Sequence, residues 1–458
     1  MSRVDTAWLR MDSPENLMMI VGVWLLEPRV SIDAVRQRVE ERLLKYRRFR
    51  QRVVEDAMGA SWVDHTAFDI TQHVVEERLK ADTKAALQAR VGQLAAQPLP
   101  ASRPLWQMHV IEDYRGRTAL IARIHHCIAD GIALIGVMLS ITDGGKAPPA
   151  RQHAESEDDW IKATLIEPFT QTTIKALGLT GNVTARGFQL LGAAIENPLK
   201  SLEPLRLAGQ MLQDAVALGA MPDDSPTRLK GKPSGKKIVA WSEPMALDEV
   251  KAVGKALGCS VNDVLLGCVS GAIGAYLRDK GDDPDGQEIR AMVPVNLRPM
   301  EQAWKLGNRF GLVPLVLPIG VANPVQRVFT VHKRMGELKG SYQPILAFSV
   351  LAVAGLLVKP AQHALLGSFS KKATAVMTNV PGPAGKLRFC GSTLEQTMFW
   401  VPQSGDIGMG VSILSYGGGV QFGLITDRGL CPDPQKIIDR FKPEFDKLLD
   451  VVMLMPWA

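Results

Sequence analysis

Two adjacent histidines, His125 and His126, carry the strongest chemical signal in the sequence, because Asp130 and Gly131 complete an HHxxxDG string behind them. The chain has only 8 histidines. A chance string of this kind is therefore on the order of one in a thousand. An imidazole with its ordinary pKa of about 6.5 is mostly unprotonated at neutral pH and can take a proton from an attacking hydroxyl. The string predicts general-base catalysis.

The elements around this string would bring one histidine to a site. The apolar run over Thr118–His126 predicts a strand, and Ile132–Ile141 predicts a helix directly after the glycine. Neighbouring side chains on a strand point to opposite faces, so one imidazole would face the site and the other the packing behind it. Gly131 would permit a backbone turn that a side chain would obstruct.

Three other interpretations stay open on this pattern alone. The histidines could be a structural pair in a core. HHxxxD also offers nitrogen and oxygen ligands for a metal, although neighbouring histidines diverge on a strand and the chain has no clear third-ligand motif. Finally, His125 and Asp130 have the HxxxxD spacing of membrane glycerolipid acyltransferases, but the FPEG-type block of those enzymes is missing downstream.

HHCIADG resembles the HHxxxDG motif of the CoA-dependent acyltransferase superfamily, typified by chloramphenicol acetyltransferase. More narrowly, the chain resembles the bacterial wax ester synthase/diacylglycerol acyltransferases, because further strings match this family in order from Asp5-Thr-Ala-Trp-Leu9 onward. These strings are Pro104-Leu105-Trp106, Asn262-Asp263, Pro294-Val295-Asn296-Leu297-Arg298, Gly307-Asn308-Arg309-Phe310, Asn379-Val380-Pro381-Gly382-Pro383 and Leu414-Ser415-Tyr416 with Phe422-Gly423. The DFGWG block of the wider superfamily is missing, as it is in the narrower family.

The resemblance implies a role for each residue of the string. His126, the second histidine, would be the base that takes the proton from an alcohol oxygen as this oxygen attacks an acyl-CoA thioester. His125 would face the packing. Asp130 would be a structural carboxylate that braces the loop, and no covalent acyl-enzyme would form. Asn262 would be a polar group of the tunnel that donates to the oxyanion or carbonyl.

Five further residues are candidates for substrate binding: Leu105, Trp106, Gly131, Asp263 and Gly355. Asp263 also has the chemistry of a helix cap, and Trp106 that of a core residue. The resemblance makes Trp106 a candidate for a channel wall. Gly355 belongs to an apolar helix predicted over 345–358, whose small residues either permit close packing or set the depth of an acyl chain. No metal and no cofactor are expected, since acyl-CoA is a substrate.

The fold expected is α/β. Strand and helix patterns alternate before residue 150 and again after 235, whereas 151–235 has helical patterns without strands. The prediction is an N-terminal domain over 1–150 with the HHxxxDG string, a helical connector over 151–235 and a second domain over 236–458. The resemblance implies two chloramphenicol acetyltransferase-like domains, with mixed sheets flanked by helices and an active-site tunnel at their interface.

The composition and charge of the chain restrict the classes of partner that it can have. The chain has 458 residues, 46% of them hydrophobic, and a net charge of +6. Apolar side chains are abundant enough for a large core, which excludes wholesale disorder. The cations form no long stripe with interleaved aromatic residues, so no nucleic-acid partner is expected. The 5 cysteines are irregularly spaced and predict free thiols in a reducing compartment.

The location expected is cytoplasmic and peripheral to a membrane or lipid inclusion. The N-terminus lacks the pattern of a secretory signal. The most apolar stretch, 344–358, is shorter than the ~20 residues of a spanning helix. Five cations close the connector, in Arg228-Leu-Lys-Gly-Lys-Pro-Ser-Gly-Lys-Lys237. They indicate either a solvated linker or an exposed loop that contacts an anionic lipid surface.

The predicted partners are a long-chain acyl-CoA and a fatty alcohol or diacylglycerol. Two alternatives to this acyltransferase remain. One is a condensation-type catalyst that uses carrier-protein thioesters, although the chain has no carrier domain. The other is an inactive protein on the surface of lipid inclusions. Such a protein would have no reason to keep both histidines and the glycine.

Overall fold

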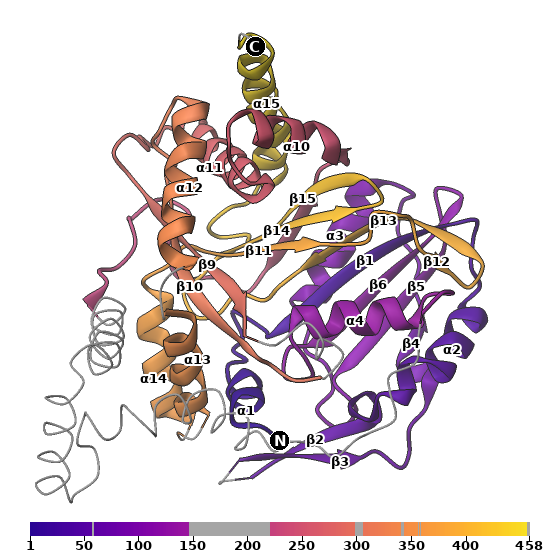
Figure 1. Ribbon diagram of the computed structural model, residues 1–458. Helices are drawn as coiled ribbons and strands as arrows, with labels where there is room; N and C mark the ends of the chain where they lie inside the picture. The colour runs from indigo at the N-terminus through magenta and orange to yellow at the C-terminus, as the bar shows by residue number, and fades with distance from the viewer. Residues whose placement is uncertain are drawn as a thin grey trace, which may run out of the picture.

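The computed structural model describes residues 1–56, 59–145, 220–297, 306–339, 343–355, 357 and 359–455. Most of the predicted connector, and the helices expected in it, lie outside the described residues. The described chain forms two mixed sheets with helices packed around them (Figure 1). The α/β architecture predicted from the sequence is confirmed.

The first sheet has the strand order β12-β13-β1-β6-β5-β4 in the described part of the chain. The strands are β1 (Met19–Glu27), β4 (Val74–Glu76), β5 (Trp106–Tyr114), β6 (Arg117–His125), β12 (Arg388–Phe389) and β13 (Ser392–Trp400). The first half of the chain also has the hairpin β2 (Gln51–Glu55) and β3 (Ala60–Asp64), with helices α2 (Ile32–Glu41), α3 (Lys84–Ala95) and α4 (Gly131–Ile141). β1 buries apolar side chains on both faces, as its continuous apolar run predicts.

The second sheet has the order β10-β9-β11-β14-β15-β7, with β8 paired to β15. Its strands are β7 (Lys237–Trp241), β8 (Met245–Ala246), β9 (Ile289–Asn296), β10 (Phe310–Leu317), β11 (Ala375–Pro381), β14 (Met409–Tyr416) and β15 (Gly419–Asp427). Helices α10 (Leu247–Ala256), α11 (Val261–Asp279), α12 (Pro324–Lys339) and α15 (Gln435–Met453) cover one face (Figure 1). The predicted stripe of α11, Leu265, Cys268, Ala272 and Tyr276, is buried in the core under these helices.

Two strands, β12 and β13, cross between the two halves of the chain. β13 comes after β11 in sequence but pairs antiparallel with β1, in the register Val21 to Trp400. The sheet of the predicted domain 1–150 is therefore completed by residues from the predicted domain 236–458. A boundary drawn along the sequence could not show this exchange, because strand pairing joins residues hundreds of positions apart.

The N-terminal helix α1 (Arg3–Arg10) joins the two halves in a second way. It packs against α13 (Gln343–Ala354), which is followed by α14 (Lys359–Ser370) (Figure 1). Gly355, at the end of α13, lies so close to the Arg3 backbone that a Cβ atom would collide with it. Of the two readings of Gly355, the structure supports close packing.

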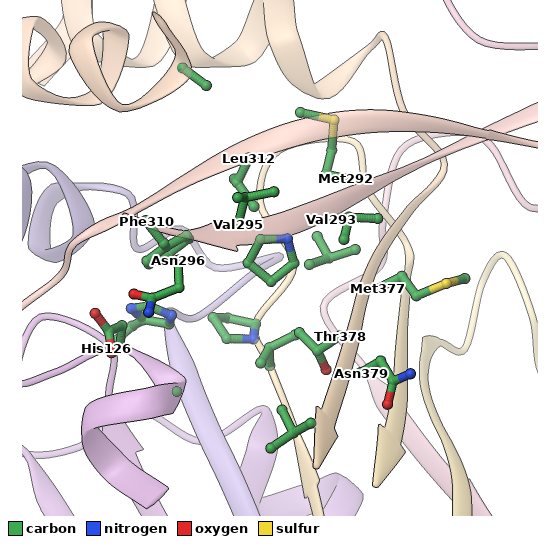
Figure 2. A pocket seen from close by; sticks show the side chains of 18 of the residues that line it. His126, Met292, Val293, Val295, Asn296, Phe310, Leu312, Met377, Thr378 and Asn379 are labelled. Carbon is green, nitrogen blue, oxygen red and sulfur yellow. The ribbon is translucent and has the colours of Figure 1, made fainter. Parts of the chain in front are cut away.

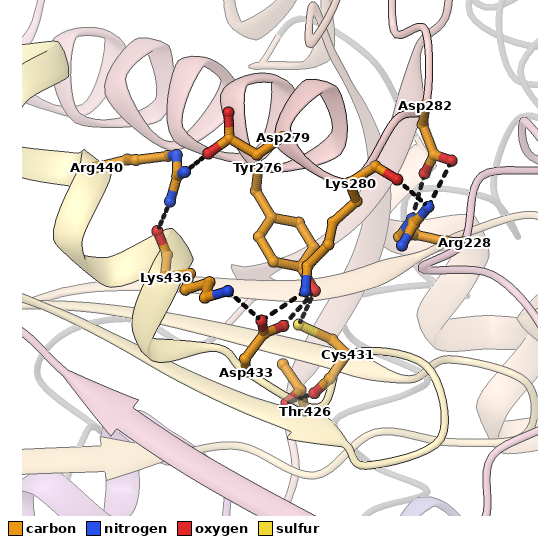
Figure 3. A network of polar contacts seen from close by, with 10 residues as sticks. All are labelled: Arg228, Tyr276, Asp279, Lys280, Asp282, Thr426, Cys431, Asp433, Lys436 and Arg440. Atoms are coloured by element: carbon orange, nitrogen blue, oxygen red, sulfur yellow. Dashed lines mark hydrogen bonds and ion pairs between the residues drawn. The ribbon is translucent and has the colours of Figure 1, made fainter.

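The cationic segment 228–237 is only in part the exposed loop that its composition suggested. Arg228 pairs with Asp282, 2.5 Å from Nε to Oδ2, and donates to the Lys280 carbonyl beside the Tyr276–Asp433 network (Figure 3). Lys230 donates to the Ser370 carbonyl at 2.7 Å. Lys237 donates to the Asn16 side chain, and burial lowers the pKa of Lys237 to about 8. The expectation of an exposed loop is wrong for Lys230 and Lys237, whereas Arg228, Lys232 and Lys236 are exposed.

None of the described helices, taken singly, has both the length and the hydropathy to span a bilayer. α10 and α11 meet this test only as a pair, and they are bent by 98° where they meet. Most of α11 is buried in the core of the second half, which accounts for its hydropathy.

Candidate active site

The two histidines stand at the end of β6, where the strand turns toward α4. The His126 side chain lines a cavity between the two sheets. The His125 side chain turns the other way: its Nδ1 accepts from the Cys127 backbone N–H at 3.1 Å, and its Nε2 lies 3.3 Å from Asp12 Oδ1. β6 ends at His125, and His126 begins the turn that follows. The two imidazoles still point to opposite sides, one into the cavity wall and one into the packing, as expected.

Aromatic rings hold the His126 imidazole. The Trp8 ring, from α1, stacks on it with centroids 4.2 Å apart and an interplanar angle of 17°. Phe310, at the start of β10, approaches to 5.6 Å. Only 4% of His126 is exposed, and burial lowers the pKa of its imidazole to about 3. The imidazole is therefore neutral at physiological pH, the state that a general base needs.

Asp130 braces the turn after the histidines. One carboxylate oxygen accepts from the Ala133 N–H at 2.9 Å and caps α4. The other accepts from the backbone N–H of Arg309 at 3.0 Å, across the boundary between the two halves. These contacts suit the structural carboxylate that the resemblance implies.

Gly131 has a different use from the one predicted. It is the first residue of α4, has no positive φ, and a Cβ atom placed on it would meet no heavy atom within 4 Å. The prediction of a turn that a side chain would obstruct is therefore wrong. Gly131 instead lines the cavity beside His126 and also lines a second apolar cavity of about 130 Å³. The missing side chain leaves space between the two cavities.

A loop from the second half anchors the histidine backbone. The Asn308 side chain donates to the His126 carbonyl at 2.8 Å and to Asp5 Oδ1 at 2.7 Å. Arg48 lies 3.1 Å from the other Asp5 oxygen and donates to the Ile128 carbonyl at 2.7 Å. Asp5 is fully buried. Sequence reasoning missed this network, and its only signal was the match of residues 5–9 and 307–310 to family strings.

The main cavity has a volume of about 610 Å³ and a mostly apolar wall (Figure 2). Polar residues also line it, among them Asn296, Thr378 and Asn379. Asn262, at the start of α11, and Asn379, on β11, are joined by a hydrogen bond of 2.7 Å from Asn379 Nδ2 to Asn262 Oδ1. Because this bond uses the oxygen of Asn262, its Nδ2 hydrogens can donate to a substrate oxygen. The structure thus places His126 and Asn262, which are far apart in sequence, in one cavity wall.

Three other candidate residues lie outside this wall. Asp263 accepts from Ser260 N at 2.9 Å in a capping box at the start of α11, and the same oxygen lies 2.8 Å from His332 Nδ1, so the predicted cap is confirmed. Leu105 and Trp106 are buried in the core of the first half, where Trp106 Nε1 donates to the Phe49 carbonyl at 2.9 Å. The structure places none of the three against the cavity.

Among the described residues, one cluster has the ligand types of a metal site: Cys259, Asp263 and His332. It lies at the start of α11, and none of its members lines the cavity of His126. The Asp263 oxygen that faces His332 is also held by the capping box. These contacts explain the cluster through helix capping.

The low pKa of His126 predicts an unusual pH dependence of turnover. Because the folded-state pKa is lowered to about 3, the neutral base persists as pH falls, and kcat/KM should stay level from pH 8 to pH 5. An imidazole of ordinary pKa would lose most of its neutral form over this range. Trp8→Ala should admit solvent to the ring and move the acid limb toward pH 6.5, while Trp8→Phe should not. If the acid limb of the wild-type kcat/KM profile lay near pH 6.5, it would contradict a lowered pKa of His126.

Comparison with known proteins agrees with the site. Residues 1–265 match the wax ester synthase/diacylglycerol acyltransferase catalytic domain, and residues 306–449 match the WS/DGAT C-terminal domain. A probable diacylglycerol O-acyltransferase of Mycobacterium tuberculosis is 26% identical over 422 residues, which cover 89% of this chain and 85% of that protein. Another from the same species is 25% identical over 463 residues, 98% of each chain.

Solved structures show the same fold. A wax ester synthase/diacylglycerol acyltransferase from Marinobacter aquaeolei VT8 is 21% identical, covers 98% of both chains and has a TM-score of 0.65. The first condensation domain of the calcium-dependent antibiotic synthetase is 13% identical, covers 99% of this chain and 95% of its own, and has a TM-score of 0.59. With both domain matches together spanning most of its length, the chain belongs to the wax ester synthase/diacylglycerol acyltransferase family.

Proposed function

We propose that this O-acyltransferase transfers a long-chain acyl group from acyl-CoA to diacylglycerol or a long-chain alcohol, with His126 as the general base. The observation that carries the proposal is a neutral, buried imidazole in the wall of a large apolar cavity. An apolar cavity suits alkyl chains, and a neutral imidazole suits an attacking hydroxyl.

The reaction needs no covalent enzyme intermediate. His126 takes the proton of the acceptor hydroxyl as its oxygen attacks the thioester carbonyl. The resulting oxyanion is stabilised by hydrogen-bond donors, for which the Asn262 amide is the proposed side chain. When the intermediate collapses, the C–S bond breaks and the imidazolium protonates the CoA thiolate. The products are an ester and free CoA.

The test is an assay of the purified chain with palmitoyl-CoA as donor and either hexadecanol or 1,2-diolein as acceptor. Free thiol is followed together with the ester product. The proposal expects thiol release that depends on the acceptor. Thiol release of equal rate without acceptor would show a hydrolase instead. Condensation domains share this fold. If an amine acceptor reacted faster than both alcohols, the result would favour condensation-type chemistry.

The proposed mechanism also predicts that chelators have no effect. It uses an imidazole and amide dipoles, and no step requires a Lewis acid. Prolonged EDTA treatment followed by desalting should therefore leave kcat unchanged. The Cys259→Ser variant is a useful control, because it removes one possible ligand from the Cys259, Asp263 and His332 cluster. Activity that EDTA removes and zinc restores would overturn this prediction.

We also propose that the chain works at a lipid surface, since its acceptor would be dissolved in lipid. Within the cationic segment, Lys230 and Lys237 donate to partners inside the protein, and the exposed Arg228 is paired with Asp282. Lys232 and Lys236 are the exposed cations of the segment that no described carboxylate neutralises, and we assign the docking charge to them. Each cation near an anionic surface contributes about 1 kcal/mol. Lys232→Gln with Lys236→Gln should therefore weaken flotation with anionic vesicles at low salt, by roughly 30-fold at most.

The control for flotation is a pair of exposed lysines elsewhere. Lys251 and Lys255 lie on α10, and their double replacement by Gln removes the same charge. An equal loss of binding in both double variants would show a response to net charge alone. If neither double variant nor added salt changes the binding to vesicles, docking depends on apolar contacts and not on charge.

A further inference from the structure

The second cavity, of about 130 Å³, lies between the first sheet and the helix α4, which packs over that sheet (Figure 1). Its described lining residues are apolar except for Trp24, Thr397 and Tyr416, which each carry one polar group. The Tyr416 hydroxyl is already engaged, since it accepts from Leu387 N at 2.7 Å and donates to the Leu394 carbonyl at 2.8 Å. A wall of this kind offers few partners to water and accommodates hydrocarbon.

The hollow follows from two small residues at the centre of an otherwise bulky sheet face. Gly22 of β1 pairs with Ala122 of β6, and both line the second cavity. Residues two positions apart on a strand share a face, so the neighbours of this pair line the cavity too. These larger neighbours are Ile20, Trp24, Leu120 and Ile124. The space under α4 is therefore set by the sequence of two adjacent strands.

The second cavity adjoins the main cavity at Gly131. Four residues line both cavities: Gly131, Val380, Phe399 and Val401. A Cβ atom placed on Gly131 would meet no heavy atom within 4 Å, so the space beside this glycine is open. His126 lines the main cavity on the same side of the turn. An alkyl chain that begins at His126 can therefore reach the second cavity past Gly131.

The chemistry of the second cavity selects an alkyl chain as its occupant. An unfilled apolar hollow destabilises a protein core, because the atoms around it lose their packing contacts. A hydrocarbon chain restores these contacts, and each CH₂ group that is buried strengthens binding by about fourfold. A polar ligand would lose its hydrogen bonds to water and find few replacements. Both substrates of the proposed reaction carry long hydrocarbon chains.

We propose that the second cavity holds part of a substrate alkyl chain, which enters it from the main cavity past Gly131. This inference rests on the proposed function and deepens it, because it makes the second cavity a determinant of chain length. The chain belongs either to the acyl-CoA or to the acceptor alcohol, which share this hydrocarbon chemistry. Gly131 is then a specificity residue, since the passage stays open only while no side chain stands there.

The experiment fills the second cavity and varies one chain at a time. Ala122→Leu enlarges a side chain that lines the second cavity and not the main one. The donor arm compares palmitoyl-CoA with octanoyl-CoA, with decanol as acceptor. The acceptor arm compares hexadecanol with octanol, with octanoyl-CoA as donor. In the arm that varies the bound chain, kcat/KM for the long substrate should fall by about tenfold or more, and that for the short substrate by less than about twofold.

A second variant and a matched control accompany this test. Gly131→Val narrows the passage itself and should lower the ratio of long-chain to short-chain kcat/KM in the same arm. It carries the test if the melting temperature shows that Ala122→Leu is not folded. Ala252→Leu makes the same substitution at an exposed position of α10 that lines neither cavity, and it should change nothing. If a folded Ala122→Leu variant keeps the wild-type ratio in both arms, the inference is overturned and the second cavity is a packing gap.

A binding measurement keeps the inference testable apart from turnover. The probe is cis-parinaric acid, a long-chain fatty acid whose fluorescence rises in an apolar environment. Its Kd should be about tenfold weaker in Ala122→Leu and unchanged in Ala252→Leu. If no alcohol supports turnover but this difference is found, the proposed function fails and the alkyl subsite stands. If turnover is found without any change in Kd or in either chain-length ratio, the subsite fails and the function stands.

Discussion

His126→Ala is expected to lower kcat by about 10²–10⁴-fold or more while the chain stays folded, as the loss of a general base implies. The ring lies in the cavity wall, and the contacts of the His126 backbone to Met18 and Asn308 do not need its side chain. The measurement is thiol release under saturating substrates, with the melting temperature taken on the same samples. The Trp8 stack is lost in the variant, so a small drop in melting temperature is expected.

His125→Ala is the matched control, because it removes the same side chain one residue away. Its imidazole accepts from Cys127 N and lies beside Asp12, outside the cavity. This variant should lose more stability than His126→Ala and much less turnover. If His125 proved essential and His126 dispensable, the assignment of the two faces of β6 would be inverted, and with it the proposed base.

Asp5→Ala is expected to have the largest effect on stability. The carboxylate is fully buried, accepts two hydrogen bonds from Asn308, at 3.0 Å from N and 2.7 Å from Nδ2, and pairs with Arg48. Removing one partner of a buried ion pair typically costs about 3–5 kcal/mol. A clear drop in the melting temperature should follow. Turnover should fall too, because Asn308 holds the His126 carbonyl.

Asp33→Ala provides the comparison. Asp33 pairs with Arg36 on α2, but its side chain is 86% exposed. Exposed pairs contribute about 0–1 kcal/mol, so the melting temperature should barely change. Asp5→Asn, which keeps one acceptor oxygen for Asn308 but loses the charge, should fall between the two. If Asp5→Ala melted like Asp33→Ala, the interface between the halves would not depend on this network.

Local patterns in the sequence predicted most of the secondary structure next to His126. An apolar run predicted β6, and the apolar run after it predicted the helix α4. Both predictions succeed because strand and helix preferences act over a few neighbouring residues. The opposite directions of the two imidazoles were expected from strand geometry, although β6 itself ends at His125. Capping by Asp263 and the buried stripe of α11 are local effects of the same kind. The ordered motifs, which resemble those of the wax ester synthase/diacylglycerol acyltransferases, then indicated the family.

Other features were decided by tertiary structure alone. Trp8 contacts His126, and Asp5 contacts Asn308, across 118 and 303 positions of the chain. The resemblance made Trp106 a candidate for a channel wall, and Trp106 lies in the core instead. Composition indicated an exposed cationic loop over Arg228 to Lys237, but Lys230 and Lys237 donate to partners inside the protein. Composition and periodicity report which side chains prefer burial or charge. They do not report which distant partner satisfies that preference, because this depends on how β13, α1 and the loop 307–310 meet in space.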